Sequence, residues 1–244
     1  MTISPKSFAV ALCAVLCASS AAWAGTIDLN ATYNGGNAFN GNTVMFTNVV
    51  ETNGAPADPA QNFYQSPAVL GDALTVNPVD FRVEILPGPG VNAVDSQLEM
   101  VIMAKPGYTI KNISMDEGGD FEVRGNANVK AEVNWFFEVL ELNGAAPPVP
   151  MTGNGTSSTA HGTPPNQSGI WNLGTSVGIP AGATKVRFEF DNRLTGQAVN
   201  DLSLAFIAKK QIGGIKVETM VPEPASVAMI LFGLIPVISR LRRR

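Results

Sequence analysis

Between Gly25 and Val221, apolar residues recur at every second position, and this alternation limits the possible folds more than any other feature of the chain. The clearest stretch is VKAEVNWFFEV, residues 129–139. Six apolar side chains there, from Val129 to Val139, fall on one face, and Phe136 is the only apolar residue on the other. A repeat of two is typical of a β-strand with one buried face. The sequence therefore predicts a body built from strands.

The same alternation predicts two further clear strands, DFRVEI at 80–85 and KVRFEF at 185–190. Weaker stretches of this kind lie at 27–33, 44–50, 97–104, 108–115, 121–124, 202–208 and 212–217. About ten strands are therefore expected. The chain also has 24 Gly and 17 Pro residues with only 15% charged residues, a composition that favours strands and turns over helices.

Turn-forming sequences separate these strands: PGPG at 87–90, EGGD at 117–120, NG at 143–144 and AGA at 181–183. Glycine supplies a positive φ and proline a fixed φ where the chain reverses, and EGGD is predicted to form a tight hairpin. Alternation with polar outer faces is typical of antiparallel sheets. Two such sheets bury their apolar faces against each other, so the predicted fold is all-β, an antiparallel β-sandwich of jelly-roll type.

Two segments are predicted to be exposed loops because they lack large apolar side chains. The longer runs from Ala145 to Gln167 and contains five prolines, and the shorter is NGAPADPAQN at 53–62. His161, the only histidine, falls in the longer segment. A Ser-His-Asp relay needs an imidazole held rigidly between two partners, so this placement argues against catalysis by His161.

Residues 1–24 have the three parts of a secretory signal peptide. Lys6 provides the positive n-region, residues 8–18 form an apolar run, and the triplet AWA places Ala22 and Ala24 at a small-x-small cleavage site. We therefore expect an N-terminal signal helix and export of the body.

The cysteines and the charge narrow the classes of partner. Both cysteines, Cys13 and Cys17, lie in the signal segment, so the body from Gly25 has no thiol for a disulfide or a metal. The whole chain has a net charge of −4, although four arginines lie at its C-terminal end. An acidic body without a basic stripe argues against nucleic acid as a partner.

An acidic run around the Gly-Gly pair at 118–119 is the one candidate metal site. Its carboxylates are Asp116, Glu117, Asp120 and Glu122. Hard oxygen ligands of this kind suit Ca²⁺, but the spacing departs from the twelve-residue EF-hand loop. The mismatch favours the competing interpretation, a solvated hairpin tip. No other cofactor is expected, because the sequence has no phosphate-binding loop, zinc spacing or nucleophile elbow.

Two pairs of carboxylates, Glu84 with Glu99 and Glu132 with Glu138, are candidates for glycoside hydrolysis. The signal is not specific, because outward strand faces carry such charges for solubility. The sequence therefore favours a body that is not an enzyme.

Aromatic residues raise a different hypothesis, a carbohydrate-binding module. Trp171, Tyr64 and Tyr33 are candidate stacking platforms, with Asn and Asp side chains to bind sugar hydroxyls. Trp135, in contrast, falls on the apolar face of its strand and is expected in the core.

The last segment of the chain is apolar and then basic. Residues 225–239 are uncharged, and as a helix they span only about 22 Å, short of the roughly 30 Å hydrocarbon core. Gly233 and Pro236 weaken that helix further. The arginines that follow are Arg240, Arg242, Arg243 and Arg244. The positive-inside rule keeps them in the cytoplasm, so we predict a C-terminal hydrophobic helix that spans the membrane marginally, with the body outside.

Pro222-Glu223-Pro224, the apolar run and the Arg-rich end, in this order over residues 222–244, resemble the PEP-CTERM sorting domain of Gram-negative bacteria. The resemblance implies recognition by an exosortase, an integral-membrane enzyme of transpeptidase type, with cleavage near the proline box. It also implies an association with exopolysaccharide and biofilm matrix. Pro222, Glu223 and Pro224 are then recognition features of a substrate, not catalytic groups.

These observations divide the chain into a signal peptide (1–24), a β-sandwich domain (25–221) and a sorting and transmembrane segment (222–244). The expected function is that of an exported, non-enzymatic surface or matrix protein, tethered transiently to the inner membrane and then moved to the cell surface or extracellular matrix. A carbohydrate-binding module in the same location is the alternative, and a secreted carboxylate-based hydrolase is the third hypothesis.

Overall fold

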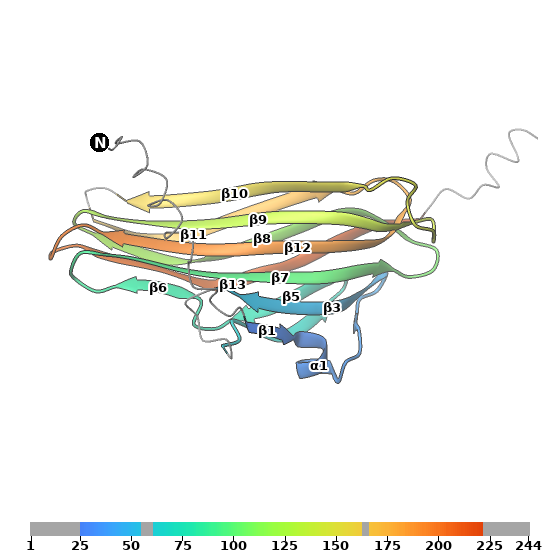
Figure 1. The fold of residues 1–244 in the computed structure, drawn as a ribbon, viewed down its shortest axis with the longest axis horizontal. Helices are drawn as coiled ribbons and strands as arrows, with labels where there is room; N and C mark the ends of the chain where they lie inside the picture. Colours follow the sequence, from blue (N-terminus) through green and yellow to red (C-terminus); the bar gives the residue numbers. More distant parts are fainter. Residues whose placement is uncertain (1–24, 55–60, 163–165, 222–244) are drawn as a thin grey trace, which may run out of the picture.

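The computed structural model of the chain describes residues 25–54, 61–162 and 166–221. These residues form two antiparallel sheets that pack face to face in a long β-sandwich (Figure 1). The predicted antiparallel sandwich is confirmed, and its jelly-roll connectivity stays a prediction. The two predicted terminal helices lie outside the described residues. Within the described ranges, no helix has the length and apolar character needed to cross a membrane.

The first sheet has seven strands in the order β1-β3-β7-β12-β9-β10, with β2 also paired to β3. Its strands are β1 (Gly25–Asp28), β2 (Phe39–Asn40), β3 (Val44–Asn53), β7 (Gly90–Ala104), β9 (Ala127–Leu142), β10 (Thr152–Gly162) and β12 (Ala183–Ala198). The second sheet has six strands in the order β11-β8-β13-β5-β4, with β6 also paired to β13. Its strands are β4 (Tyr64–Leu70), β5 (Ala73–Pro78), β6 (Arg82–Ile85), β8 (Thr109–Arg124), β11 (Gln167–Gly178) and β13 (Leu204–Met220).

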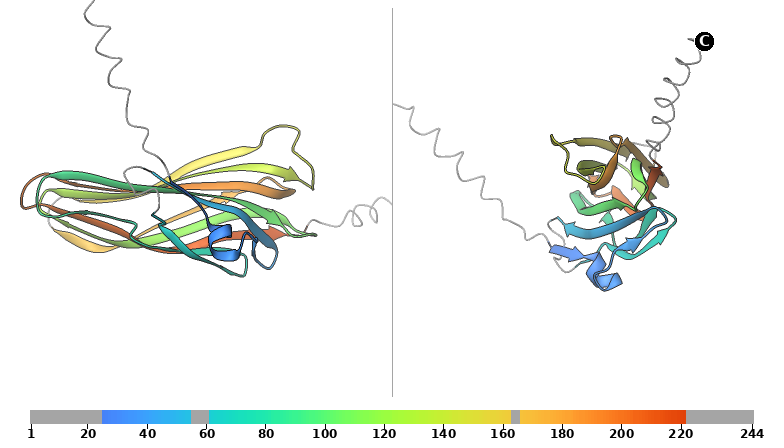
Figure 2. Two further views of the ribbon diagram at one scale, coloured as in Figure 1. Left: turned by 60° about the horizontal axis from the view of Figure 1, so that its bottom comes forward. Right: turned by 90° about the vertical axis from the view of Figure 1, so that its right-hand side faces the viewer.

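Five strands, β7, β8, β9, β12 and β13, have 15 to 17 residues each and run along the long axis of the sandwich (Figure 2). At about 3.3 Å per residue, each spans roughly 50 Å. The last strand, β13, ends at Met220, paired with Thr109 at the start of β8. The end of the sandwich domain therefore lies at one end of the long axis.

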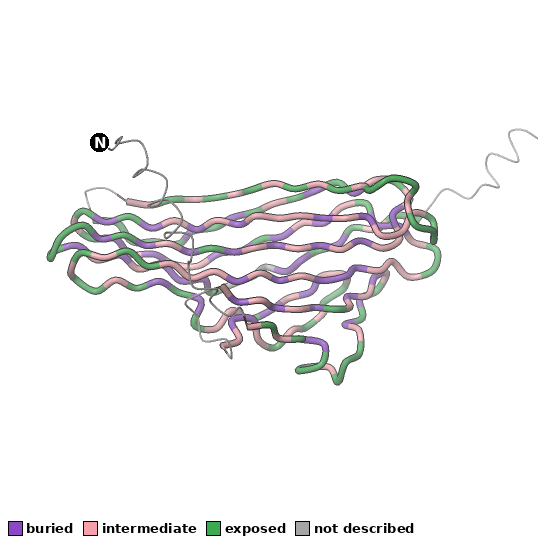
Figure 3. The backbone as a smooth tube through the Cα atoms, viewed as in Figure 1, coloured by how far each residue is buried: buried purple, intermediate pink, exposed green. Residues whose placement is uncertain are grey.

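The core lies between the two sheets and follows the predicted alternation, visible as alternating buried and less buried positions along the strands (Figure 3). On β9, Val129, Val133 and Phe137 are buried, and Trp135 is partly buried against them, as predicted. On β12, Phe188 and Phe190 are buried too. The buried face of these two strands is therefore specified by a repeat of two.

The predicted strand at 27–33 is wrong from Leu29 onward, where the chain forms the short helix α1 (Leu29–Asn34). Asp28 caps this helix, since its Oδ1 accepts a hydrogen bond from Ala31 N at 2.9 Å. Gly35 closes the helix with φ +58°, the left-handed conformation that glycine adopts without strain.

The predicted EGGD hairpin is wrong, because residues 117–120 lie inside β8. The stretches at 108–115 and 121–124 therefore form one strand, and those at 202–208 and 212–217 likewise merge into β13. A Cβ on Gly118 would stand 2.9 Å from the carbonyl oxygen of Trp171 on β11. The glycine pair thus permits close approach of neighbouring groups and does not form a turn.

The predicted long loop from Ala145 to Gln167 is also wrong, because Thr152–Gly162 form strand β10 at the edge of the first sheet. Gly153 pairs with Phe137 and Gly155 pairs with Trp135 on β9. A Cβ on Gly155 would stand 2.7 Å from Trp135 Cε2. Glycine therefore leaves room for the aromatic rings of β9, and the strand needs few apolar residues of its own.

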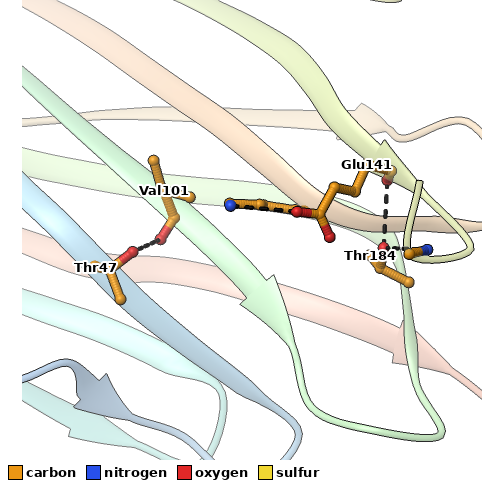
Figure 4. Close-up of polar contacts among 6 residues, drawn as sticks. Thr47, Val101, Glu141 and Thr184 are labelled. Atoms are coloured by element: carbon orange, nitrogen blue, oxygen red, sulfur yellow. Dashed lines mark hydrogen bonds and ion pairs between the residues drawn. The ribbon is translucent and has the colours of Figure 1, made fainter. Parts of the chain in front are cut away.

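The predicted turns at 143–144 and 181–183 are confirmed at the end where β9 meets β12. Asn143 and Gly144 have φ +50° and +82°, as a tight turn requires. Thr184 Oγ1 accepts a hydrogen bond from Gly144 N at 3.2 Å and donates one to the carbonyl oxygen of Glu141 at 3.5 Å. Thr47 Oγ1 similarly donates to the carbonyl oxygen of Val101 at 3.3 Å, linking β3 to β7 (Figure 4).

Candidate binding cleft

The predicted cation site does not assemble, because its carboxylates separate and take different partners. Glu117 is buried and pairs with Lys209, whereas Asp120 and Glu122 are less buried and pair with Lys210 and Arg124. Successive side chains on a strand point to opposite faces, so residues 116–122 do not converge once they form a strand. Within the described part of the chain, no group of three His, Cys, Asp or Glu side chains is placed to hold a metal ion.

The predicted carboxylate pairs do not come together either. Glu84 lies on β6 and Glu99 on β7, strands of different sheets, and neither side chain is buried in the core between them. Glu132 and Glu138 lie six residues apart on β9, about 20 Å along the strand. Glycoside hydrolysis needs carboxyl groups within about 10 Å, so neither pair supports the hydrolase hypothesis.

Two of the three predicted stacking platforms are buried. Trp171 and Tyr64 are 2% and 0% exposed, so neither can stack on a ligand. Tyr33, on α1, is 39% exposed, and its hydroxyl oxygen accepts a hydrogen bond from Asn62 Nδ2 at 3.1 Å. Only Tyr33 therefore remains as a platform.

His161 lies on strand β10 and not in the predicted loop. Its imidazole stacks on the ring of Phe121, with 3.8 Å between the ring centroids and 11° between the planes. Partial burial lowers the pKa of His161 below its usual value. The stack joins the edge of the first sheet to β8 of the second, which gives His161 a structural role.

The predicted signal-cleavage residues, the sorting motif at 222–224 and the terminal arginines all lie outside the described residues.

An open polar cleft of about 400 Å³ lies where β3 ends and β7 continues beyond it. β3 pairs with β7 only as far as Asn53 and Ser96, so the first residues of β7 extend past this pairing. Polar side chains line the cleft from both sheets and the segments beside them: Gln61, Asp80, Arg82 and Asn92. The cleft therefore offers hydrogen-bond donors and acceptors of both charges at a junction of the two sheets.

A second hollow of about 180 Å³ adjoins the cleft at Gly54 and contains two carboxylates, Asp95 and Asp191. Burial raises the pKa of Asp191, and the charge of Asp95 raises it further. A Cβ on Gly54 would overlap the Asp95 carboxylate, so glycine at this position lets the side chain fold across the end of β3. The two acids therefore form an electronegative section of the outer sheet face.

A third hollow of about 110 Å³ continues along the same face and is lined by Lys130, Glu132, Arg193 and Thr195. Arg193 on β12 pairs with Asp95 on β7 on one side and with Glu132 on β9 on the other. The three hollows thus lie in sequence across β3, β7, β12 and β9. We call them together the polar band.

A buried hydrogen-bond network supports the polar band from below. The Glu51 carboxylate accepts hydrogen bonds from Phe63 N at 2.9 Å, Tyr64 N at 3.1 Å and Ser96 Oγ at 3.1 Å. Glu51 is 0% exposed, and burial raises its pKa to about 7 against the lowering effect of these hydrogen bonds. Glu51 therefore holds the segment after Gln61 against β3 and β7.

This site was hard to predict from the sequence, because its residues come from separate stretches of the chain. Asp95, Asp191 and Arg193 each occupy an ordinary outward position of a strand. The one available signal was the predicted loop at 53–62, since Gly54 and Gln61, near its two ends, line the cleft.

No family model matches this chain, and no curated protein matches it. Among solved structures, it is similar to TmCBM61 in complex with beta-1,4-galactotriose, at 9% identity over 70% of this chain and 82% of that one, with a TM-score of 0.22. It is also similar to the enzymatically active domain of tailspike protein 4 from bacteriophage CBA120, at 11% identity over 78% of this chain and 19% of that one, with a TM-score of 0.17. Likenesses this low carry no argument about function.

Proposed function

We propose that this protein is an exported, non-enzymatic surface or matrix component, sorted through a C-terminal signal of the PEP-CTERM type by an exosortase. The observation that carries the proposal is the sequence from Pro222 onward, with its proline box, apolar run and arginines in order. The fold supports it, because β13 ends at one end of the long axis, two residues before Pro222. A membrane-bound enzyme then gains access to the tail without disturbing either sheet.

The experiment compares the mature C-terminus and the location of the protein in cells with and without the sorting enzyme. We expect mass spectrometry to find the RLRRR end missing from the surface-localised protein and retained in the membrane fraction of cells that lack the enzyme. Replacing Pro222, Glu223 and Pro224 by alanine should have the same effect as loss of the enzyme. Replacing Pro147 and Pro148, which lie between β9 and β10, is the matched control. An intact RLRRR end on the surface-localised protein contradicts the proposal.

The second candidate function is carbohydrate binding by the exported body, and the polar band is the observation that favours it. Sugar hydroxyls are recognised by carboxylate, amide and guanidinium groups placed in open clefts, and Asp95, Asp191 and Arg193 supply such groups. Tyr33 lies near the cleft, because its hydroxyl oxygen accepts a hydrogen bond from Asn62. Asn62 directly follows Gln61, which lines the cleft. We therefore propose a polysaccharide of the matrix as the ligand class for this surface.

Affinity electrophoresis in gels that contain matrix polysaccharide tests this second function. We expect the mobility of the protein to fall with polysaccharide concentration, and Asp95→Asn with Asp191→Asn to weaken binding by about tenfold, the effect of losing charge-assisted hydrogen bonds. Glu84→Gln, on β6 and outside the polar band, should leave binding unchanged. Equal retardation of all the variants, or none of the wild type, counts against the polar band as the binding surface.

A further inference from the structure

A lysine and a glutamate face each other in the core of the sandwich. Lys209 Nζ lies 2.7 Å from Glu117 Oε2, and the two side chains are 0% and 1% exposed. Lys209 on β13 pairs with Gly119 on β8, two residues beyond Glu117, so the pair is diagonal across neighbouring strands. Neither residue is expected to be buried from the sequence, since Glu117 falls in the predicted hairpin tip and Lys209 stands next to Lys210.

The surroundings of this pair are aromatic. Lys209 Nζ lies 4.9 Å from the ring centroid of Phe81 and 5.9 Å from that of Tyr64. Burial lowers the pKa of Lys209, although the charge of Glu117 opposes this effect. In such surroundings two charges are costly to hold, and transfer of one proton from the ammonium to the carboxylate leaves a neutral amine beside a neutral acid.

We propose that Lys209 and Glu117 condense into an intramolecular isopeptide bond that covalently joins β13 to β8. The lone pair of the neutral Nζ attacks Cδ of the protonated Glu117 carboxyl group, forming the C–N bond. One C–O bond then breaks, and the hydroxyl group leaves with a proton from Nζ as one molecule of water. The product is a secondary amide that keeps one N–H. No oxidant, reductant or other reactant is consumed.

The site supplies what the uncatalysed condensation lacks. A desolvated lysine is an effective nucleophile because its amine is neutral. The two groups are already in contact, which is equivalent to an effective concentration of about 10⁵ M or more. The amide product is uncharged, so it also avoids the cost of holding an ion pair in an apolar core.

The adjacent pair, Lys210 with Asp120, provides an internal comparison. Its atoms are equally close, at 2.6 Å, but its side chains are 63% and 35% exposed. Solvent surrounds this pair, so it lacks the apolar surroundings that favour proton transfer from Lys209 to Glu117. The proposal therefore predicts a bond at Lys209 and none at Lys210.

Such a bond would suit a body without cysteine. Residues 25–221 contain no Cys, so no disulfide can join their strands. An amide between Lys209 and Glu117 closes a loop of roughly 90 residues and restricts the unfolded chain as a disulfide does. In a protein held by its C-terminal tail, as proposed above, pulling force enters through β13, and the bond passes it to β8. The bond itself does not depend on that tether.

Mass spectrometry of the purified full-length protein tests the proposal directly. We expect the denatured wild-type chain to be lighter than its sequence by one water, and a proteolytic digest to contain one branched peptide that joins Lys209 to Glu117. Lys209→Met should restore the full mass expected for that variant, while Lys210→Met should keep the loss of one water. In denaturing gels the wild-type chain should migrate faster than Lys209→Met, because a closed loop makes the unfolded chain more compact.

Several results overturn the proposal. One is the full sequence mass in folded wild-type protein, with unmodified peptides that contain Lys209. Another is the loss of one ammonia, because this would identify an amide such as that of Asn192, which is buried beside Tyr64, as the acceptor in place of Glu117. A loss of water that maps to any other residue overturns it too. Since the wild type alone decides among these outcomes, a variant that fails to fold does not affect the test.

Discussion

Trp171 Nε1 donates a hydrogen bond to the carbonyl oxygen of Ala208 at 3.1 Å, although the two residues lie two strands apart. Trp171 is on β11 and Ala208 on β13, and β8 runs between them. The indole crosses β8 at Gly119, which pairs with Trp171 on one side and with Lys209 on the other. Three strands of the second sheet are therefore joined at a position where only glycine leaves enough space.

The first prediction follows from this crossing. A Cβ on Gly119 would stand 2.9 Å from Trp171 Nε1 and still closer to the carbonyl oxygen of Ala208, so Gly119→Ala should displace the indole. We expect a loss of about 2 kcal/mol in the free energy of unfolding, measured with urea. Gly178→Ala, on β11 with open space around its Cβ position, is the control and should change it by less than about 0.5 kcal/mol. Equal midpoints for the two variants would show that the crossing tolerates a side chain.

Much of the fold could be predicted because each strong strand carries its own apolar face. β9 and β12 alternate with few exceptions, such as Phe136, and each of them has a strand on both sides in the first sheet. β10 could not be found in this way, because Gly153 and Gly155 contribute no side chain and the aromatic rings of β9 cover them. The stability of β10 therefore depends on its partner strand, and its own residues show no apolar alternation.

The polar band and the buried charges were beyond prediction for a related reason. Lys209 and Glu117 compensate each other only after β13 and β8 pair in one register. From the sequence alone, a lysine next to Lys210 and a glutamate next to Gly118 both suggest exposure to solvent. Glu51 is similar, since its partners come from β7 and from the segment that precedes β4.

The second prediction concerns Glu51 and pH. Burial raises its pKa to about 7 in the folded protein from 4.5. The folded state therefore retains a proton that the unfolded state has released, and stability falls as the pH rises from about 4.5 to about 7. Glu51→Gln removes this titration. We expect the stability of the wild type relative to Glu51→Gln to decrease by up to about 3 kcal/mol between pH 4.5 and pH 7.5.

Urea unfolding at the two pH values measures this difference. Glu84→Gln, on the exposed face of β6, serves as the control and should show the same pH dependence as the wild type. If Glu51→Gln also parallels the wild type, the Glu51 carboxyl titrates normally, and the buried network does not perturb it.

The third prediction uses the fact that His161 is the only histidine. Its imidazole signals in an NMR titration are therefore unambiguous, and we expect a pKa below 6.5 because burial disfavours the charged ring. Phe121→Ala removes the stacked ring and should move the pKa upward toward 6.5. Phe136→Ala, on the outer face of β9, should leave it unchanged. An upward shift in the control alone, or a wild-type pKa above 6.5, would contradict the stacked arrangement.

The fourth prediction tests whether the rings of β9 hold β10 in place. A Cβ on Gly155 would stand 2.7 Å from Trp135 Cε2, so Gly155→Ala should push the edge strand away from the sheet. Among the described strands, β10 pairs only with β9. We therefore expect the backbone amides of Thr152–Gly162 to exchange with deuterium about tenfold faster or more, while those of β12 keep their protection. Ser158→Ala, at an exposed position of the same strand, should leave these rates unchanged. If Gly155→Ala leaves the exchange of β10 unaltered, the strand does not depend on glycine at this position.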